Sequence, residues 1–125
     1  MATILVIDDE LPMRRLLSRL LTGAGHTVHE AADGHAGLAL FEEVHPALVI
    51  TDIVMPEMEG IETILELRRG GSPVPILAIS GGAAPPLYLH AATGLGATAA
   101  LPKPFAPDAL LNAVTELLAT IRSPE

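Results

Sequence analysis

Four parts of this sequence carry side chains that could act together on a phosphoryl group. An acidic run occupies residues 8–10, a further carboxylate is Asp52, a hydroxyl is Ser80 and an ammonium group is Lys103. Carboxylates held close together repel one another and raise each other's pKa. Mg²⁺ suits such a cluster, because it binds one or two carboxylates together with phosphate oxygens.

The same residue types match what phosphoryl transfer requires. A carboxylate can attack phosphorus and become an aspartyl phosphate, and the transferring group carries charge on three oxygens. Mg²⁺ would hold one of these oxygens, the ammonium group of Lys103 another and the hydroxyl of Ser80 the third. Gly81 and Gly82 follow directly and would let the backbone approach closely.

Taken singly, each of these motifs is ordinary. An acidic pair such as Asp8-Asp9 often stands where a helix begins, and an aspartate such as Asp52 commonly forms a turn. Ser80 before two glycines is a weak turn signal. The meaning of these residues therefore depends on whether the fold brings them to one place.

The elements that must position them follow from the pattern of apolar residues. Short apolar runs, typical of buried strands, alternate with amphipathic stretches typical of helices. Strands are expected at Thr3–Ile7, His26–Ala31, Ala47–Thr51, Ile76–Ile79 and Thr98–Leu101. Helices are expected at Leu11–Leu21, from a capping Asp33 to about Val44, and at Ile61–Arg69, Leu87–Thr93 and Asp108–Ile121.

This alternation predicts an α/β fold, a doubly wound (βα)5 sandwich in which helices cover both faces of a parallel sheet. In such sheets, ligands bind at the carboxyl ends of the strands. The acidic run, Asp52, Ser80 and Lys103 each stand at or just after the end of an expected strand. We therefore expect the fold to gather all of them at one edge.

Length and charge limit the classes of function. The 125 residues fit one domain, and the start of the chain lacks the basic region of a signal peptide. The absence of cysteine suits the cytosol. With a net charge of −8 and no basic patch of any size, the chain is not expected to bind nucleic acid. The basic residues are interpreted as solvated helix faces: Arg14, Arg15 and Arg19 on the first helix, with Arg68 and Arg69 elsewhere.

The stretch between Arg69 and Lys103 contains no Asp, Glu, Lys or Arg. A membrane span is not expected there, because prolines and glycines divide the stretch into pieces shorter than a bilayer requires. Buried strands and one uncharged helix are the preferred interpretation.

Across about residues 3–121 the sequence resembles the receiver domain of the response regulators of bacterial two-component systems. The matching stretches are Ile4-Leu5-Val6-Ile7-Asp8-Asp9-Glu10, Thr51-Asp52-Ile53-Val54-Met55-Pro56 with Gly60, Ile79-Ser80-Gly81, and Lys103-Pro104-Phe105. Single motifs of this kind are not specific, but their combination is. The resemblance implies a flavodoxin-like sheet of order 2-1-3-4-5 and one cytoplasmic receiver domain at residues 1–125.

The resemblance also implies a role for each matched acidic residue. Asp52 would accept a phosphoryl group from a histidine kinase or a histidine phosphotransfer protein. Asp9 and Asp52 would bind Mg²⁺ together with the main-chain carbonyl of Val54, and Asp8 would act through water.

Two further residues would act on the phosphoryl group itself. Lys103 would contact it, Ser80 would swing toward it, and the Lys103–Pro104 peptide bond would be cis. Such a protein is a signalling module rather than an enzyme, although it assists its own phosphorylation and dephosphorylation.

The sequence departs from the family pattern in the part that should report phosphorylation. Ala100 stands where the family usually has Tyr, Phe or His, Pro102 precedes Lys103, and Pro85-Pro86 opens the fourth helix. The fourth helix, fifth strand and last helix are the expected contact for a downstream partner or a second copy. Without an aromatic side chain, the switch is expected to work through Ser80 and the loop after it, by displacement of the fourth helix, or hardly at all.

Two other classes of protein use part of this set of residues. A phosphatase or phosphomutase that forms an aspartyl phosphate commonly needs a second aspartate two residues after the nucleophile, where this chain has Val54. A flavin-binding electron carrier would need phosphate-binding hydroxyls after the first strand and aromatic residues around the flavin. This chain has Asp8-Asp9 at that place and an aromatic content of 2%, so both alternatives are disfavoured.

Overall fold

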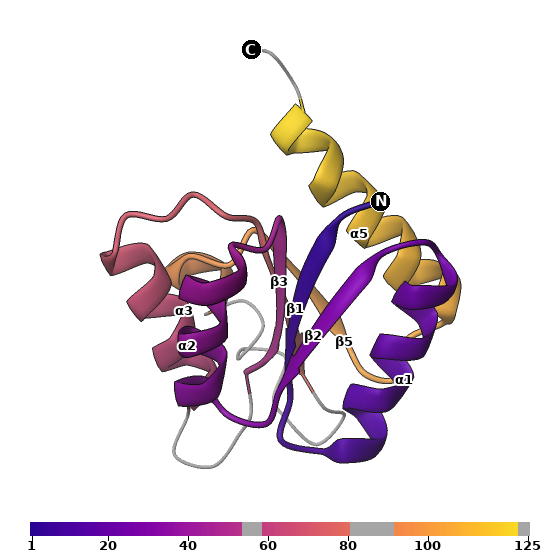
Figure 1. The fold of residues 1–125 in the computed structure, drawn as a ribbon, viewed down its shortest axis with the longest axis horizontal. Helices are drawn as coiled ribbons and strands as arrows, with labels where there is room; N and C mark the ends of the chain where they lie inside the picture. Colours follow the sequence, from indigo (N-terminus) through magenta and orange to yellow (C-terminus); the bar gives the residue numbers. More distant parts are fainter. Residues whose placement is uncertain (54–58, 81–91, 123–125) are drawn as a thin grey trace.

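Strands and helices alternate along the chain in a computed structural model, which describes residues 1–53, 59–80 and 92–122 (Figure 1). The strands are β1 (Thr3–Ile7), β2 (Thr27–Ala31), β3 (Leu48–Asp52), β4 (Ile76–Ser80) and β5 (Ala99–Pro102). The helices are α1 (Leu11–Gly23), α2 (Gly34–Val44), α3 (Glu59–Arg69) and α5 (Pro107–Arg122), and residues 92–95 form a further helical segment.

The strands form one parallel sheet of order β2-β1-β3-β4-β5. This confirms the predicted doubly wound sandwich and its strand order. Helices α2 and α3 cover one face of the sheet, and α1 and α5 cover the other (Figure 1). The predicted helix Leu87–Thr93 lies mostly outside the described residues.

Burial explains why the central strands read as unbroken apolar runs. β3 and β4 are buried at every residue, and β1 is buried at all but its first, because helices pack on both faces. Alternate side chains along each strand enter opposite cores. One core, on the side of α2 and α3, includes Leu5 and Val49, whereas the other, on the side of α1 and α5, includes Ile4 and Ile50.

Local signals in the sequence set the helices that flank the site. α1 carries Pro12 in its first turn, where a missing backbone N–H costs nothing, and it buries Leu17 and Leu21. α2 begins after Asp33, whose carboxylate accepts a hydrogen bond from the backbone N–H of Ala36 at 2.8 Å, as predicted for a cap.

Two glycines allow helices to lie directly against strands. A β-carbon at Gly37 of α2 would overlap the side chain of Ile7 in β1. A β-carbon at Gly60, in the first turn of α3, would overlap the carbonyl oxygen of Asp52 and come within 2.5 Å of the α-carbon of Ile53. The start of α3 is therefore in backbone contact with the end of β3.

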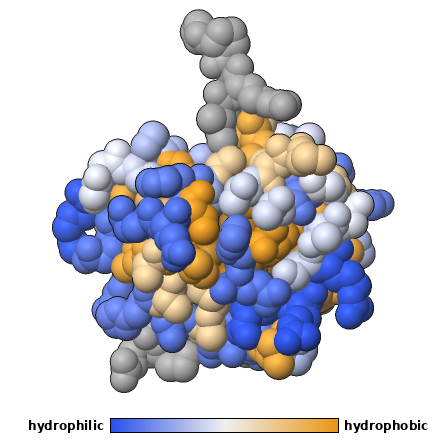
Figure 2. Space-filling model, viewed as in Figure 1, coloured by the Kyte–Doolittle hydropathy of each residue, from blue (hydrophilic) through white to orange (hydrophobic). Residues whose placement is uncertain are grey.

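The surface is mainly hydrophilic on the face shown in Figure 2, where apolar residues appear in separate patches. Among the described residues, the large apolar side chains that are exposed include Leu11 and Leu16 on α1, and Leu95. No helix within the described parts of the chain has the length and hydropathy needed to cross a membrane.

Candidate phosphoryl-transfer site

Main-chain hydrogen bonds bring the carboxyl ends of neighbouring strands level with one another. The backbone N–H of Ile53, just after β3, donates to the carbonyl of Ile79 in β4 at 2.9 Å. The backbone N–H of Lys103, just after β5, donates to the carbonyl of Ser80 at 2.7 Å. The sheet register therefore fixes the spacing between Asp52, Ser80 and Lys103, as the sequence predicted for one shared edge.

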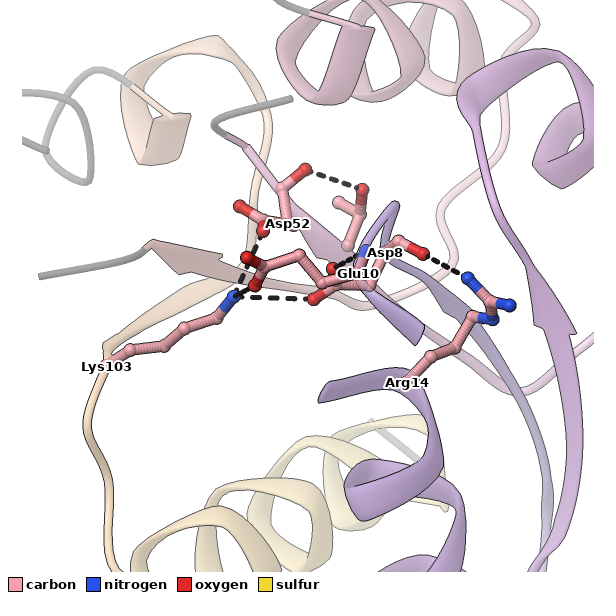
Figure 3. Close-up of polar contacts among 6 residues, drawn as sticks. Asp8, Glu10, Arg14, Asp52 and Lys103 are labelled. Atoms are coloured by element: carbon pink, nitrogen blue, oxygen red, sulfur yellow. Dashed lines mark hydrogen bonds and ion pairs between the residues drawn. The ribbon is translucent and has the colours of Figure 1, made fainter. Parts of the chain in front are cut away.

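The ammonium group of Lys103 lies among three carboxylates (Figure 3). Its Nζ is 3.0 Å from Oδ2 of Asp52, 3.4 Å from Oδ2 of Asp8 and 3.8 Å from Oε1 of Glu10. The side chains of Asp8, Asp52 and Lys103 are only 0%, 5% and 10% exposed, whereas that of Glu10 is 66% exposed. Water therefore screens the contacts of Asp8 and Asp52 with Lys103 much less than the contact of Glu10.

Asp8 is the most deeply buried of these carboxylates. Burial raises its pKa above the ordinary value, and the nearby carboxylate of Asp52 raises it further. The backbone N–H of Glu10, which donates to Oδ1 of Asp8 at 2.9 Å, and the ammonium group of Lys103 oppose that rise without cancelling it. The surroundings of Asp8 thus make its ionisation less favourable in the folded protein than in the unfolded chain.

For Lys103 the surroundings favour the charged form, whereas for Asp8 they disfavour it. Burial alone would lower its pKa, but the hydrogen bond and charge of Asp52, together with the charge of Asp8, outweigh burial and raise the pKa. Lys103 is therefore a firmly protonated cation at neutral pH. Its position between two buried carboxylates suits it to hold a phosphoryl oxygen.

Ser80 ends β4 with a hydroxyl that has no hydrogen-bond partner in the described part of the chain. The residue is 2% exposed, so neither a protein group among the described residues nor bulk solvent satisfies this hydroxyl. Leaving a buried hydroxyl unpaired costs about 1–3 kcal/mol. An acceptor that entered the site, such as a phosphoryl oxygen, would recover that free energy.

The structure brings together a slightly different acidic set from the one implied by the resemblance. Carboxylate oxygens of Asp8, Glu10 and Asp52 all lie within 4.8 Å of one another. Asp9 is exposed and is not part of this group, and Val54 lies outside the described residues. Glu10 was not assigned a role from the sequence, although its place in the acidic run directly after a strand was the available signal.

These residues fit a divalent metal ion by the chemistry of their donors. Hard cations such as Mg²⁺ take oxygen ligands, and two of the gathered carboxylates are largely removed from water. A cation would also relieve the repulsion that contributes to the raised pKa of Asp8. The acidic cluster could therefore bind a metal ion.

Two further expectations about this edge have clear outcomes. The Lys103–Pro104 peptide bond is cis, as predicted. The interpretation of the arginines as solvated is correct for Arg15, Arg19 and Arg69, which are exposed, but wrong for Arg14 and Arg68. The guanidinium group of Arg68 donates to the carbonyl oxygens of Ser72, Val74 and Gly96. The Arg14 side chain is 16% exposed because its guanidinium group turns back to contact Glu30 and the carbonyl oxygen of Asp8.

A family model and the sequences of related proteins point to the same family. The family model described as response regulator receiver domain matches residues 4–115. The probable transcriptional regulator ycf27 of Cyanophora paradoxa is 37% identical over 124 residues, which are 97% of this chain and 50% of that protein. The response regulator MprA of Mycolicibacterium vanbaalenii is 38% identical over 117 residues, covering 92% of this chain and 49% of that protein.

Solved structures of the same architecture include a protein of similar length. The chemotaxis protein CheY4 of Vibrio cholerae is 33% identical, with a TM-score of 0.85 over 94% of this chain and 98% of that one. By contrast, the chain spans about half the length of the curated relatives ycf27 and MprA.

Proposed function

Because the chain belongs to the receiver-domain family of response regulators, the signalling modules of two-component systems, we propose that Asp52 accepts a phosphoryl group. The observation that carries the proposal is the position of Lys103 Nζ, 3.0 Å from Asp52 and 3.4 Å from Asp8, at the edge of the sheet where Ser80 ends β4. A nucleophile, a cation and a hydrogen-bond donor thus stand at one edge.

In the proposed reaction the donor is a phosphohistidine on a histidine kinase or histidine phosphotransfer protein. A carboxylate oxygen of Asp52 forms a bond to phosphorus while the bond from phosphorus to the histidine nitrogen breaks, and that electron pair stays on the nitrogen. The signal ends when a water oxygen attacks phosphorus, the bond to Asp52 breaks and inorganic phosphate leaves. The chain assists both steps on itself and is otherwise a switch rather than an enzyme.

Different side chains around Asp52 would bind different oxygens of the phosphoryl group. Lys103 would exchange one of its carboxylate contacts for a phosphoryl oxygen, and the Ser80 hydroxyl would donate to another. Mg²⁺, when bound, supplies the remaining positive charge. We assign it to Asp9, Asp52 and the carbonyl of Val54, with Asp8 acting through water.

The proposed output is a change in protein contacts rather than in nucleic-acid binding. The net charge of −8 offers no footprint for a phosphate backbone. We assign the contact with a downstream protein, or with a second copy, to the fourth helix, β5 and α5, in the cytoplasm.

The test is phosphorylation by a small donor. Incubation with acetyl phosphate and Mg²⁺ should add one phosphoryl mass to the intact chain, as measured by mass spectrometry. Asp52→Asn should abolish the addition, because the amide is not a nucleophile for this transfer.

Asp108→Asn is the matched control, because Asp108 is an exposed aspartate in the first turn of α5 and should leave labelling unchanged. Equal labelling of Asp52→Asn and the wild type would contradict the proposal, as would a folded wild-type chain that takes no label.

A further inference from the structure

Arg14 on α1 makes two contacts that connect the acidic loop to the neighbouring strand. Its Nη1 donates to the main-chain carbonyl oxygen of Asp8 at 2.8 Å, and its Nε donates to Oε1 of Glu30, in β2, at 3.2 Å. Figure 3 shows Arg14 approaching Asp8 from the side opposite Lys103. One guanidinium group thus contacts both the end of β1 and β2.

The partner of Arg14 is itself held in place. The hydroxyl of Ser18, one turn further along α1, donates to Oε2 of Glu30 at 2.8 Å, so both carboxylate oxygens of Glu30 are engaged. The pair is half-buried, with side-chain exposures of 16% for Arg14 and 30% for Glu30. Such a pair has a defined geometry, unlike a fully exposed ion pair.

The contacts of Asp8 show how Arg14 fixes the main chain next to this carboxylate. Its backbone N–H donates to the carbonyl of Ala31 at 3.1 Å, and its backbone carbonyl accepts from Arg14, so both flanking peptide groups are fixed. The Asp8 carboxylate then accepts from the backbone N–H of Glu10 and faces Lys103. Without Arg14, the peptide after Asp8 would lose its side-chain anchor.

We propose that Arg14 is a positioning residue for the acidic cluster: it fixes the main chain at Asp8 so that this carboxylate faces Lys103 and acts through water on a bound divalent cation. The inference rests on the proposed function for its metal ion. It adds a residue that touches neither phosphoryl group nor metal, and it makes the Arg14–Glu30 pair part of the site.

A purely electrostatic role for Arg14 predicts the opposite sign. If only its charge mattered, removing a cation near the carboxylates would make the site more negative and would tighten Mg²⁺ binding. If its geometry matters, removal weakens Mg²⁺ binding although the site becomes more negative. Arg14→Lys separates the two roles, because lysine keeps the charge but lacks the planar fork that reaches two acceptors.

The experiment is calorimetric titration of the whole chain with Mg²⁺. Arg14→Met should weaken Mg²⁺ affinity about tenfold, which is the size of effect seen when groups that orient metal ligands are removed. Arg14→Lys should weaken it by less but measurably. Arg15→Met, an exposed arginine on the same turn of α1, is the matched control and should leave the affinity unchanged.

A second measurement needs no metal. The backbone N–H of Glu10 is protected by its hydrogen bond to Asp8, so hydrogen exchange at this amide should become faster in metal-free Arg14→Met. It should remain at the wild-type rate in Arg15→Met. A merely structural role would accelerate exchange across α1 and β2 alike and would leave Mg²⁺ affinity unchanged.

The outcomes separate the two proposals. A wild-type chain that neither binds Mg²⁺ nor accepts a phosphoryl group contradicts the proposed function. A wild type that does both, with Mg²⁺ affinity unchanged or tighter in Arg14→Met, contradicts the positioning role alone. If Arg14→Met does not fold, Arg14→Lys and Glu30→Gln decide, since each should weaken Mg²⁺ binding while keeping most of the packing.

Discussion

Asp8 is a residue of the site whose burial opposes its own charge. Its carboxylate is fully buried, and its pKa is raised by burial and by the neighbouring Asp52. The folded protein therefore binds a proton at Asp8 more tightly than the unfolded chain does. By linkage, ionised Asp8 lowers the free energy of unfolding at neutral pH.

Asp8→Asn should stabilise the metal-free chain at pH 7 by about 1 kcal/mol, because it removes this cost. The advantage should shrink as the pH falls through the raised folded pKa of Asp8 and disappear below its ordinary value of 3.8, where the wild type is also uncharged at this position. Urea unfolding in the presence of a chelator at several pH values measures the stabilisation at pH 7 and its loss at low pH.

The same substitution should weaken Mg²⁺ binding, so that stability and metal affinity move in opposite directions. Asp108→Asn, on the exposed first turn of α5, should leave Mg²⁺ affinity unchanged and should lower stability slightly through the helix dipole, the opposite sign to Asp8→Asn. A lower stability of metal-free Asp8→Asn at pH 7 would show that the contact of Asp8 with Lys103 outweighs its burial.

At the scale of residues, the sequence predicted those members of the site that parallel pairing places. Asp52, Ser80 and Lys103 follow from the alternation of strands and helices, since strand ends meet at one edge. The acidic run placed Glu10 at the same edge, but its contact with Lys103 and the contacts of Arg14 could not be predicted. These contacts depend on the direction in which side chains leave the start of α1, which hydropathy does not determine.

At the scale of elements, the contact between α3 and the end of β3 is set by Gly60. The backbone of α3 lies so close to Asp52 that a methyl group has no room. Gly60→Ala should therefore destabilise the chain by about 1–3 kcal/mol, because backbone rather than a flexible side chain would have to move. It should also slow labelling of Asp52 by acetyl phosphate.

Gly23→Ala is the matched control for this prediction. Gly23 ends α1, and a β-carbon there would meet nothing within 4 Å. This substitution should stabilise the chain by about 0.5–1 kcal/mol, as expected for alanine in place of a helical glycine. Thermal unfolding of both variants would test the pair, and an equally stable Gly60→Ala would mean that α3 can shift freely away from β3.

The ends of the strands show the limit of prediction from the pattern of apolar residues alone. The apolar runs predicted strands that end at Thr51 and Ile79, whereas the structure extends them to Asp52 and Ser80. Ladder pairing of Asp52 with Ile79, and of Ser80 with Pro102, continues the sheet through polar residues. The end of a strand depends on its pairing partners, and the hydropathy of one strand does not show which residues these partners are.

At the scale of the whole molecule, the absence of an aromatic residue in β5 restricts how a signal can leave the site. Ala100 pairs with Ala78 of β4 and packs against the core on the side of α2 and α3. Its methyl group has no alternative rotamer to adopt when Ser80 moves. The change is then expected to pass through Ser80 and the chain that follows it, by displacement of the fourth helix, or hardly at all.

Beryllofluoride, a mimic of the phosphoryl group, should therefore shift amide NMR signals mainly in residues 80–95 and only modestly in residues 98–101. Residues 81–91 lie outside the described residues, so this remains a prediction from the sequence and from the surroundings of Ala100. Asp52→Asn with beryllofluoride supplies the control spectrum. Shifts centred on residues 98–101 would contradict a route through the segment after Ser80.

The order of strands in the sheet also determines when the site comes into being during synthesis. The first half of the chain contains β2, β1 and β3, which pair only with one another until β4 is present. These strands carry the acidic residues, but Lys103 follows β5, the last strand to leave the ribosome. A nascent or truncated chain would thus hold the carboxylates without their counter-charge, and a competent site appears only once the sheet is complete.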